Sequence, residues 1–240
     1  MHNKYVWLMC LIIGLSGLIV VKYGMAKMTS ERSIKAFEQN APALKEQLQA
    51  KNLEFGAPIF IRIFKSESIL ELWIENKQGK FELFKHYPIC KFSGKLGPKL
   101  KEGDRQSPEG FYFVKPNQLN PNSRFHLSFN IGFPNAYDRF HQRTGSALMV
   151  HGNCVSIGCY AMGDDAIEEI YTLITAAFEN KQPFFRIHIF PFYMDATNMN
   201  QYKNNNWYDF WLNLKQGYDA FENNHQVPNV EVKNGQYIFE

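Results

Sequence analysis

Three neighbouring stretches of alternating apolar and polar residues constrain the fold of this chain more than any other feature. They run over residues 59–64, 69–74 and 81–87, and short turns rich in Ser, Glu, Asn, Lys and Gly separate them. Alternation with a period of two is typical of a β-strand with one buried face. Because the connections are short, we expect the three strands to form an antiparallel meander.

Further strands and one long helix follow the meander. Short apolar runs predict four more strands, at 111–114, 125–130, 147–150 and 184–190. Apolar residues spaced three and four apart predict a helix that Asp164 caps and that ends near Asn180. These elements together predict an α+β fold that is mainly β.

The segments on either side of this region differ from it in composition. Residues 30–51 are polar and predict one or two helices, interrupted at Pro42 and with Asn40 as an N-cap. Near the C-terminus an aromatic helix around Trp211 precedes a hairpin over 230–239, whose Asn-Gly pair is typical of a type I′ turn. We expect this tail to form a subdomain that packs on the main sheet.

The first 28 residues have the composition of an export signal. Lys4 precedes an apolar run from Tyr5 to Val21, whose length of about 17 residues suits either a cleaved signal peptide or an uncleaved membrane anchor. Both alternatives place the rest of the chain outside the cytoplasm. We expect a signal or anchor at 1–28, a helical linker at 29–56, the main domain at 57–193, and a helical and hairpin extension at 194–240.

Charge and cysteine content narrow the classes of function. A net charge of +3, with Lys and Arg scattered along the chain, does not favour nucleic-acid binding. Cysteines tend to pair in an oxidising compartment, and the exported part contains Cys90, Cys154 and Cys159. An odd number leaves at least one thiol free. We interpret Cys90 as a small buried apolar residue, and a Cys154–Cys159 disulfide stays open as an alternative.

The residues best suited to chemistry lie between 149 and 160. His151 and Cys159 are eight positions apart, with Gly152 and Gly158 beside them. A thiol becomes a strong nucleophile when a base removes its proton, and histidine is the usual base. The glycines allow sharp turns and leave amide groups that could hold an oxyanion. The helix predicted just beyond Cys159 would favour a thiolate through its dipole.

A zinc site is the alternative from another class of protein. His141, His151, Cys154 and Cys159 are all residue types that bind zinc. The histidines are ten positions apart and the cysteines five, and these spacings fit none of the usual zinc motifs. We therefore expect neither a metal nor a cofactor.

Three separated motifs resemble the L,D-transpeptidase catalytic domain (YkuD) family. They are His-Gly followed by Ser-x-Gly-Cys at 151–159, Gly-Asp-x-x-Ser-Pro-x-Gly at 103–110, and Phe-Pro-Asn-Ala-Tyr-Asp-Arg at 133–139. The last motif, with Gly-Cys-Tyr-Ala-Met at 158–162, resembles the YafK-like branch of the family more narrowly. The resemblance implies that 57–193 is a catalytic domain with an antiparallel β-sandwich or barrel-like fold.

The resemblance also implies acyl transfer on the stem peptides of peptidoglycan. Cys159 would attack a carbonyl carbon, His151 would shuttle the proton, Gly158 would lie in the oxyanion region, and Ser156 would support the turn. The acyl group would then pass to an amine. In the alternative it passes to water, and the protein is an amidase that releases a covalently attached lipoprotein from peptidoglycan.

Two positions beside the nucleophile depart from the common family pattern. Ile157 stands where that pattern has a second histidine, and Ala161 stands where it often has an arginine. The loop between the two halves of the motif is also shorter. These differences leave open the choice between transfer and hydrolysis. A wall-binding module without catalysis is a further alternative, which reaction of Cys159 with a carbapenem would exclude.

Substrate recognition and location complete the predictions. A stem peptide carries carboxylates, which a guanidinium binds in bidentate fashion, so we predict substrate contacts at Arg143 and Arg139, with Tyr137 and His141 lining the same groove. The expected partners are stem peptides and a wall-linked outer-membrane lipoprotein, without nucleic acid and with an N-terminal membrane anchor as one alternative. The expected location is the periplasm, reached by a signal peptide or by tethering to the inner membrane.

Overall fold

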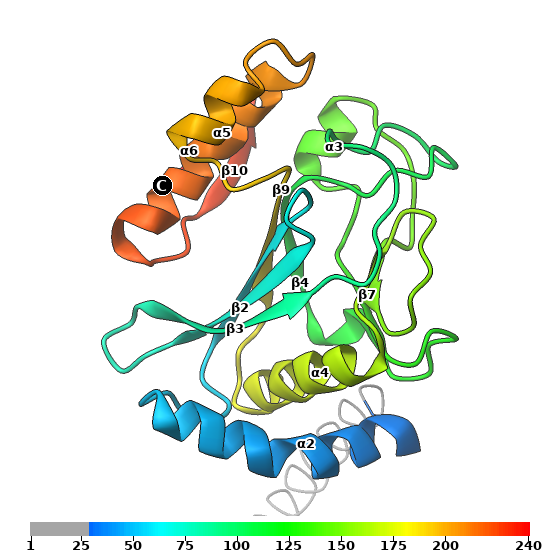
Figure 1. Ribbon diagram of the computed structural model, residues 1–240, viewed down its shortest axis with the longest axis vertical. Coiled ribbons are helices and arrows are strands. Elements are labelled where there is room, and N and C mark those ends of the chain that lie inside the picture. Colours follow the sequence, from blue (N-terminus) through cyan, green and yellow to red (C-terminus); the bar gives the residue numbers. More distant parts are fainter. Residues whose placement is uncertain (1–28) are drawn as a thin grey trace, which may run out of the picture.

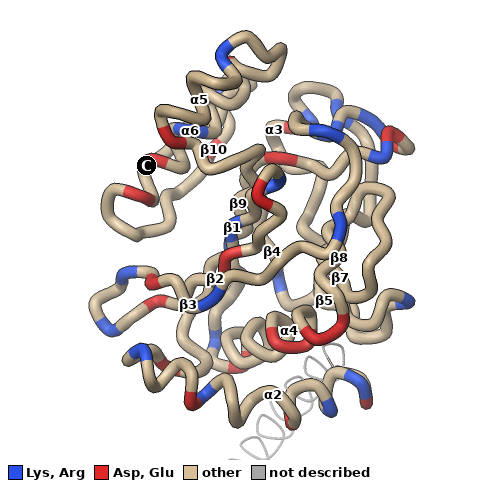
Figure 2. The backbone as a smooth tube through the Cα atoms, in the orientation of Figure 1, with Lys and Arg blue, Asp and Glu red and all other residues tan. Residues whose placement is uncertain are grey.

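The computed structural model describes residues 29–240, which form three separate β-sheets and several helices (Figure 1). The predicted signal or anchor at 1–28 lies outside the described residues. Among residues 29–240, no helix combines the length and the hydropathy that a membrane span needs. Basic and acidic residues are interspersed along the chain (Figure 2), as the scattered charge in the sequence indicated.

The main sheet has five strands in the order β3-β2-β1-β9-β4. β1 (Ile59–Phe64), β2 (Ile69–Glu75) and β3 (Phe81–Pro88) form the predicted antiparallel meander. β9 (Phe185–Phe190) pairs parallel with β1 and antiparallel with β4 (Gly110–Val114), so the sheet is mixed rather than antiparallel throughout. A parallel pair needs a long crossover connection, and the chain between β1 and β9 is long and includes a helix directly before β9.

A smaller sheet of four short strands lies beside the main sheet (Figure 1). Its strands, in order, are β5 (Leu119–Asn120), β6 (Ser128–Asn130), β7 (Met149–His151) and β8 (Tyr160–Ala161). β7 and β8 are parallel, and the other pairs are antiparallel. The α+β class is confirmed. No sheet of the described residues closes into a barrel, so the barrel-like alternative is wrong.

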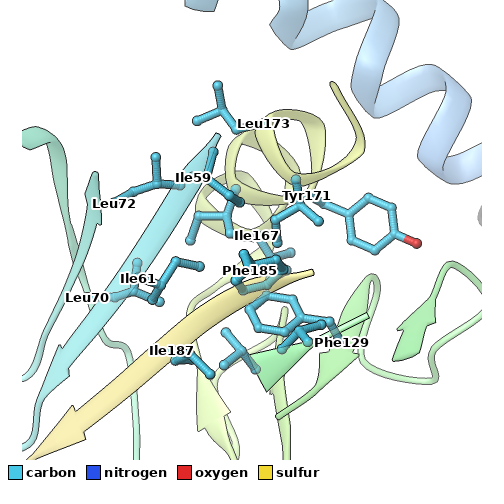
Figure 3. Packing of buried hydrophobic residues seen from close by; sticks show 14 of the residues in the cluster. Ile59, Ile61, Leu70, Leu72, Phe129, Ile167, Tyr171, Leu173, Phe185 and Ile187 are labelled. Atoms are coloured by element: carbon cyan, nitrogen blue, oxygen red, sulfur yellow. The ribbon is translucent and has the colours of Figure 1, made fainter. Parts of the chain in front are cut away.

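The crossover helix, α4 (Asp164–Glu179), covers one face of the main sheet. Its buried side chains include Ile167, Ile170 and Ile174, which join the inner faces of β1 and β9 in one core (Figure 3). Phe185, Ile187 and Ile189 of β9 belong to this core, so the two residues between them, Arg186 and His188, face the other way. Figure 3 shows Phe185 and Ile187 in this core. This alternation decides which residues of β9 reach the opposite side of the sheet.

A second helix, α2 (Glu31–Ala50), packs on the outer side of α4 (Figure 1). It begins after Ser30, which caps it, and continues through Pro42, so the predicted interruption and the Asn40 cap are wrong. A proline inside a helix costs about 3 kcal/mol. Burial of Leu44 and Leu48 at 1% and 0% exposure stabilises the helix by about 1.5–3 kcal/mol for each side chain, which offsets that cost.

The C-terminal extension covers the opposite face of the main sheet. It contains α5 (Ala196–Gln201), α6 (Tyr208–Asn224) and the predicted hairpin of β10 (Val230–Lys233) and β11 (Gln236–Phe239). Phe221 of α6 contacts the rings of Phe60 and Trp73 on the sheet. Because helices cover both faces, all six residues of β1 are buried, where the alternation predicted a single buried face.

Candidate active site

β7 and β8 bring the predicted base and nucleophile to the same face of the smaller sheet. Val150 pairs with Tyr160, and His151 pairs with Ala161. Because side chains alternate along a strand, Cys159, directly before β8, faces the same side as His151. The sulfur atom of Cys159 lies 3.4 Å from the backbone nitrogen of Met149. Cys159 and His151 are therefore diagonal neighbours on adjacent strands.

The ring of His151 is buried and held by two neighbours. Its Nδ1 atom lies 2.5 Å from the carbonyl oxygen of Gly152, and the ring of Phe125 stacks on it at 4.8 Å. A carbonyl oxygen only accepts, so Nδ1 carries the proton and Nε2 keeps a lone pair. Burial lowers the pKa of His151 below its ordinary value of 6.5. The imidazole is therefore neutral near pH 7, as a general base must be.

Cys159 carries a free and partly exposed thiol. Burial raises its pKa above the ordinary value of 9.0, although the N–H of Met149 and the charge of Lys99 act in the opposite direction. Helix α4 begins with Asp164 and Asp165, so acidic side chains already occupy its first turn. The expectation that the helix would favour a thiolate is therefore wrong for the resting protein. Its Cys–His pair is a thiol beside a neutral imidazole.

Ser156 closes the turn that presents Cys159. Its hydroxyl donates to the carbonyl oxygen of Cys159 at 2.7 Å and accepts from the N–H of Gly158 at 3.2 Å. Ser107 donates to the same carbonyl oxygen at 3.2 Å. Gly158 has a φ of +146°, which residues with a side chain rarely adopt. Among residues 29–240, the N–H of Cys159 itself meets no backbone acceptor.

A disulfide joins the loop before Cys159 to the end of β3. It links Cys154 to Cys90, whose Cα atoms are 5.4 Å apart although 64 positions separate them in the sequence. The interpretation of Cys90 as a buried apolar residue is wrong, because it is exposed and bonded. The alternative Cys154–Cys159 disulfide is wrong as well, and Cys159 is the free cysteine among the described residues.

The same disulfide removes the zinc alternative. Cys154 is bonded to Cys90 and so cannot be a ligand, while Nε2 of His141 lies 2.8 Å from the carbonyl oxygen of Gly235. Within residues 29–240, no three or more His, Cys, Asp or Glu side chains are arranged to hold a metal ion.

Lys99 is a residue of the site that the sequence did not single out. Its side chain is buried, and its Nζ atom lies 2.5 Å from Oδ1 of Asp104. Asp104 also accepts from three backbone N–H groups of its own loop, and so fixes the turn. Lysines also occupy positions 95 and 101. Only the fold shows that the charge of Lys99 acts on Cys159.

A fully buried ion pair anchors the loop around Ser107 to the main sheet. Nζ of Lys65, directly after β1, lies 2.9 Å from Oε1 of Glu109 and donates to three backbone carbonyls between residues 95 and 107. Glu109 also accepts from the indole N–H of Trp211 at 2.9 Å. Ser107, which holds the carbonyl of Cys159, is therefore tied to both the sheet and α6.

The predicted substrate-binding arginines differ in their surroundings. Arg143 is 7% exposed, and its Nη1 atom lies 2.9 Å from Oδ1 of the buried Asp138. This ion pair gives Arg143 a structural contact and occupies part of its guanidinium. Arg139, on α3 (Ala136–Phe140), is exposed and donates to the carbonyl of Pro134. The substrate role of both residues stays a prediction.

The other two predicted substrate contacts pack against the C-terminal hairpin. Tyr137 is buried and stacks on Tyr237 with ring centroids 4.3 Å apart. His141, directly after α3, contacts the carbonyl of Gly235 in the hairpin turn. Their role in substrate binding stays a prediction, and the contacts shown here join α3 to the C-terminal extension.

The chain is similar to proteins of known family. Residues 58–189 match the family model of the L,D-transpeptidase catalytic domain, YkuD. YafK of Escherichia coli strain K12, which is named as an L,D-transpeptidase, is 50% identical over 184 residues that cover 76% of this chain and 74% of YafK. The corresponding protein of Escherichia coli O157:H7 matches with the same identity and coverage.

Two solved structures also align with the chain. The helical cell shape determining protein Pgp2 of Campylobacter jejuni is 15% identical, with a TM-score of 0.44 over 80% of each chain. Bd1075 of Bdellovibrio bacteriovorus is 17% identical, with a TM-score of 0.40 over 74% of this chain and 78% of that one.

Proposed function

The chain belongs to the L,D-transpeptidase catalytic domain (YkuD) family, and from this premise we propose that it is a cysteine-dependent acyl transferase of peptidoglycan stem peptides. The observation that carries the proposal is the free thiol of Cys159 on the same strand face as the neutral imidazole of His151. The base on β7 and the nucleophile directly before β8 then face one side of the smaller sheet, with the N–H of Cys159 beside them, as acyl transfer requires.

The chemistry follows from the neutral state of the pair. Nε2 of His151 takes the thiol proton while the sulfur of Cys159 bonds to a carbonyl carbon of the stem peptide. The carbonyl oxygen becomes an oxyanion that the N–H of Cys159 stabilises. The carbon–nitrogen bond then breaks, His151 returns its proton to the leaving amine, and a thioester remains on Cys159. Lys99 supports the negative charge that develops on the sulfur.

The thioester has two fates, which define the proposed function and its alternative. Attack by an amine completes a transpeptidation, and attack by water completes a hydrolysis, with His151 taking a proton from either acceptor. One observation favours hydrolysis. Ile157, which stands where the common family pattern has a histidine, is 80% exposed on the loop before Cys159, so this position offers an apolar side chain rather than a hydrogen-bonding group for an amine. Under this alternative the protein releases a lipoprotein from peptidoglycan.

The proposed place of action is outside the cytoplasm, where peptidoglycan lies. The Cys90–Cys154 disulfide supports this location, because structural disulfides persist in oxidising compartments such as the bacterial periplasm. The apolar run within residues 1–28 provides the route, as a signal peptide or as a tether to the inner membrane.

The experiment that tests the proposal combines purified protein with defined muropeptides. Wild-type protein should form a thioester on Cys159, visible by mass spectrometry of the intact chain. Cys159→Ala should lower turnover by about 10³-fold or more, because no other group can form the acyl-enzyme. Val155→Ala, an exposed position in the same loop, is the matched control and should retain activity. Turnover by Cys159→Ala would contradict the proposal.

The same experiment separates transfer from hydrolysis. Stem peptides are incubated with and without a peptide that ends in lysine, and the products are weighed. A product with the mass of the joined peptides identifies transfer. Release of the lysine peptide from a joined muropeptide, with uptake of water, identifies the amidase.

A further inference from the structure

One partly buried cation of the structure has no carboxylate partner. Four other buried basic side chains each pair with a carboxylate: Arg62 with Glu71, Lys65 with Glu109, Lys99 with Asp104, and Arg143 with Asp138. Among residues 29–240, the guanidinium of Arg186 on β9 forms no such ion pair. It donates to Oδ1 of Asn229 at 2.7 Å and lies 5.4 Å from the ring centre of Phe184.

His188 lies two residues further along the same face of β9. It is fully buried, and neither ring nitrogen has a hydrogen-bond partner among residues 29–240. The rings of Phe60 and Phe111 enclose it, with centroids 4.7 Å and 4.6 Å away. A buried polar group without a partner costs about 1–3 kcal/mol. One strand face therefore holds a partly exposed guanidinium without a carboxylate partner and, beside it, a buried imidazole whose nitrogens the described chain does not satisfy.

Both side chains line one cavity. It has a volume of about 360 Å³ and lies between β4, β9 and the C-terminal hairpin. Its wall is mainly apolar and includes Phe111, Phe113, Phe184, Val230 and Val232. Its size falls in the range of small-molecule sites, which combine apolar walls with a few polar groups.

The charges around this cavity have one sign. Lys115 is the second cation of the lining, and its Nζ atom lies 5.4 Å from the ring centre of Phe113. Within the described part of the chain, no acidic side chain lines the cavity. A cation that burial deprives of water is stabilised by a bound anion. The cavity therefore complements a negative charge attached to an apolar group.

We propose that this cavity binds a small organic carboxylate with an apolar or aromatic body. The carboxylate accepts from the guanidinium of Arg186, whose geometry matches it, and faces the ammonium of Lys115. The ring of His188 belongs to the lining and is buried behind Phe111, so it reports on occupancy of the cavity without contacting the ligand through its nitrogens. The apolar body packs between Phe113, Phe184 and the hairpin. This site is distinct from Cys159 and does not depend on acyl transfer.

Phenylacetate and its neutral analogue phenylacetamide test the proposal. Each is titrated into the full chain in detergent, and the ¹⁵N signals of the His188 ring are followed by nuclear magnetic resonance. We expect phenylacetate to bind at least about tenfold more tightly than phenylacetamide and to shift the His188 signals. Arg186→Gln should remove this preference. Lys203→Gln, which removes an exposed charge away from the cavity lining, is the matched control and should keep it.

A second variant keeps the test decisive if Arg186→Gln does not fold. Val232→Trp fills the cavity from the hairpin without changing a charge, and it should abolish binding. Equal affinity for acid and amide, binding that Arg186→Gln and Val232→Trp both leave intact, or no binding of phenylacetate at millimolar concentration would each overturn the proposal. None of these results bears on the reaction of Cys159.

The source of the carboxylate is distinguished by a peptide arm. N-acetyl-Gly-Phe, with a free C-terminus, is compared with its C-terminal amide. Binding of the peptide acid at least about tenfold tighter than phenylacetate identifies a peptide C-terminus as the ligand class. Affinity no higher than that of phenylacetate identifies a free organic acid, and both results support a carboxylate site.

Discussion

Lys65, directly after β1, and Arg186, on the neighbouring strand β9, are both cations, and the structure accommodates them in opposite ways. Lys65 follows β1, is 0% exposed, and meets one carboxylate and three backbone carbonyls. Arg186 of β9 meets a neutral amide and an aromatic ring, without a carboxylate among residues 29–240. A buried cation whose N–H groups all meet acceptors within the protein has a structural role. A cation that lacks a carboxylate partner is instead available to bind an anionic ligand.

The same contrast separates the two functional regions. Around Cys159, the hydroxyls of Ser107 and Ser156 and the carboxylate of Asp104 are all engaged within the protein. The thiol and the imidazole are therefore held in place before substrate arrives. In the second region, the guanidinium of Arg186 lines a cavity and has no carboxylate partner among residues 29–240, so it is left for a ligand to bind.

Removing Lys65 should have the largest effect on stability. Lys65→Met leaves the carboxylate of Glu109 buried without a counter-charge, and should lower the free energy of unfolding by about 3–5 kcal/mol. Urea denaturation measures this change. Lys77→Met is the matched control, because its ion pair with Glu54 is exposed and worth less than about 1 kcal/mol. Equal effects of the two variants would break the comparison.

Removing the disulfide should have the next largest effect. The double variant Cys90→Ser/Cys154→Ser should lose about 2–4 kcal/mol of unfolding free energy, because the unfolded chain gains conformational freedom. Turnover should fall too, since the loop that presents Cys159 loses its anchor at β3. Urea denaturation and the muropeptide assay measure the two effects. Unchanged stability would show that the bond contributes nothing to this region.

The pH dependence of alkylation sharpens the description of the Cys–His pair. Because burial raises the pKa of Cys159 above 9.0, its thiolate form increases only at alkaline pH. The rate of reaction with iodoacetamide, followed by mass spectrometry, should rise through pH 9 without a plateau near neutral pH. A plateau between about pH 6 and pH 8 would instead indicate a preformed thiolate–imidazolium pair.

The pKa of His151 sets the acid side of the activity profile. Since burial lowers this pKa below 6.5, the imidazole stays neutral and able to accept a proton at neutral pH. Turnover should therefore fall on acidification only below pH 6.5. A fall that begins above this pH would contradict the geometry of the buried ring.

The smallest effect is expected from Arg186. In the absence of ligand, Arg186→Gln should change the free energy of unfolding by less than about 1 kcal/mol, because the lost charge had no buried partner to leave behind. Arg143→Gln is the contrasting variant, since it leaves the buried Asp138 unpaired and should cost several kcal/mol. If both variants cost the same, Arg186 belongs to the framework and the comparison fails.

Local sequence signals predicted much of the fold. β1, β2, α4 and the C-terminal hairpin follow from periodicity and turn residues alone, and their observed bounds lie close to the predicted ones. The parallel pairing of β1 with β9 could not be predicted from local sequence signals, because it joins segments more than a hundred residues apart. Pro42 misled the prediction of α2, since packing on α4 outweighs the local cost of a proline.

The part of the site that could be predicted is the part encoded in a short sequence motif, namely the base and the nucleophile. His151 and Cys159 were expected to act together, and the β7–β8 register, which pairs His151 with Ala161, is compatible with that prediction. The Cys90–Cys154 bond was missed, because residues near in space and far in sequence leave no local pattern. Lys99 was missed for the same reason. Its charge reaches Cys159 only after two loops fold together.

The bridge between Cys90 and Cys154 has a consequence for how the protein matures. It spans 64 positions, whereas Cys159 is five positions from Cys154 and meets it more often in the unfolded chain, because short loops close at lower entropic cost. Oxidation before folding would therefore favour a Cys154–Cys159 disulfide, which blocks the nucleophile. Production of active molecules requires that the meander forms first, or that a thiol-exchange catalyst in the same compartment corrects the early bond.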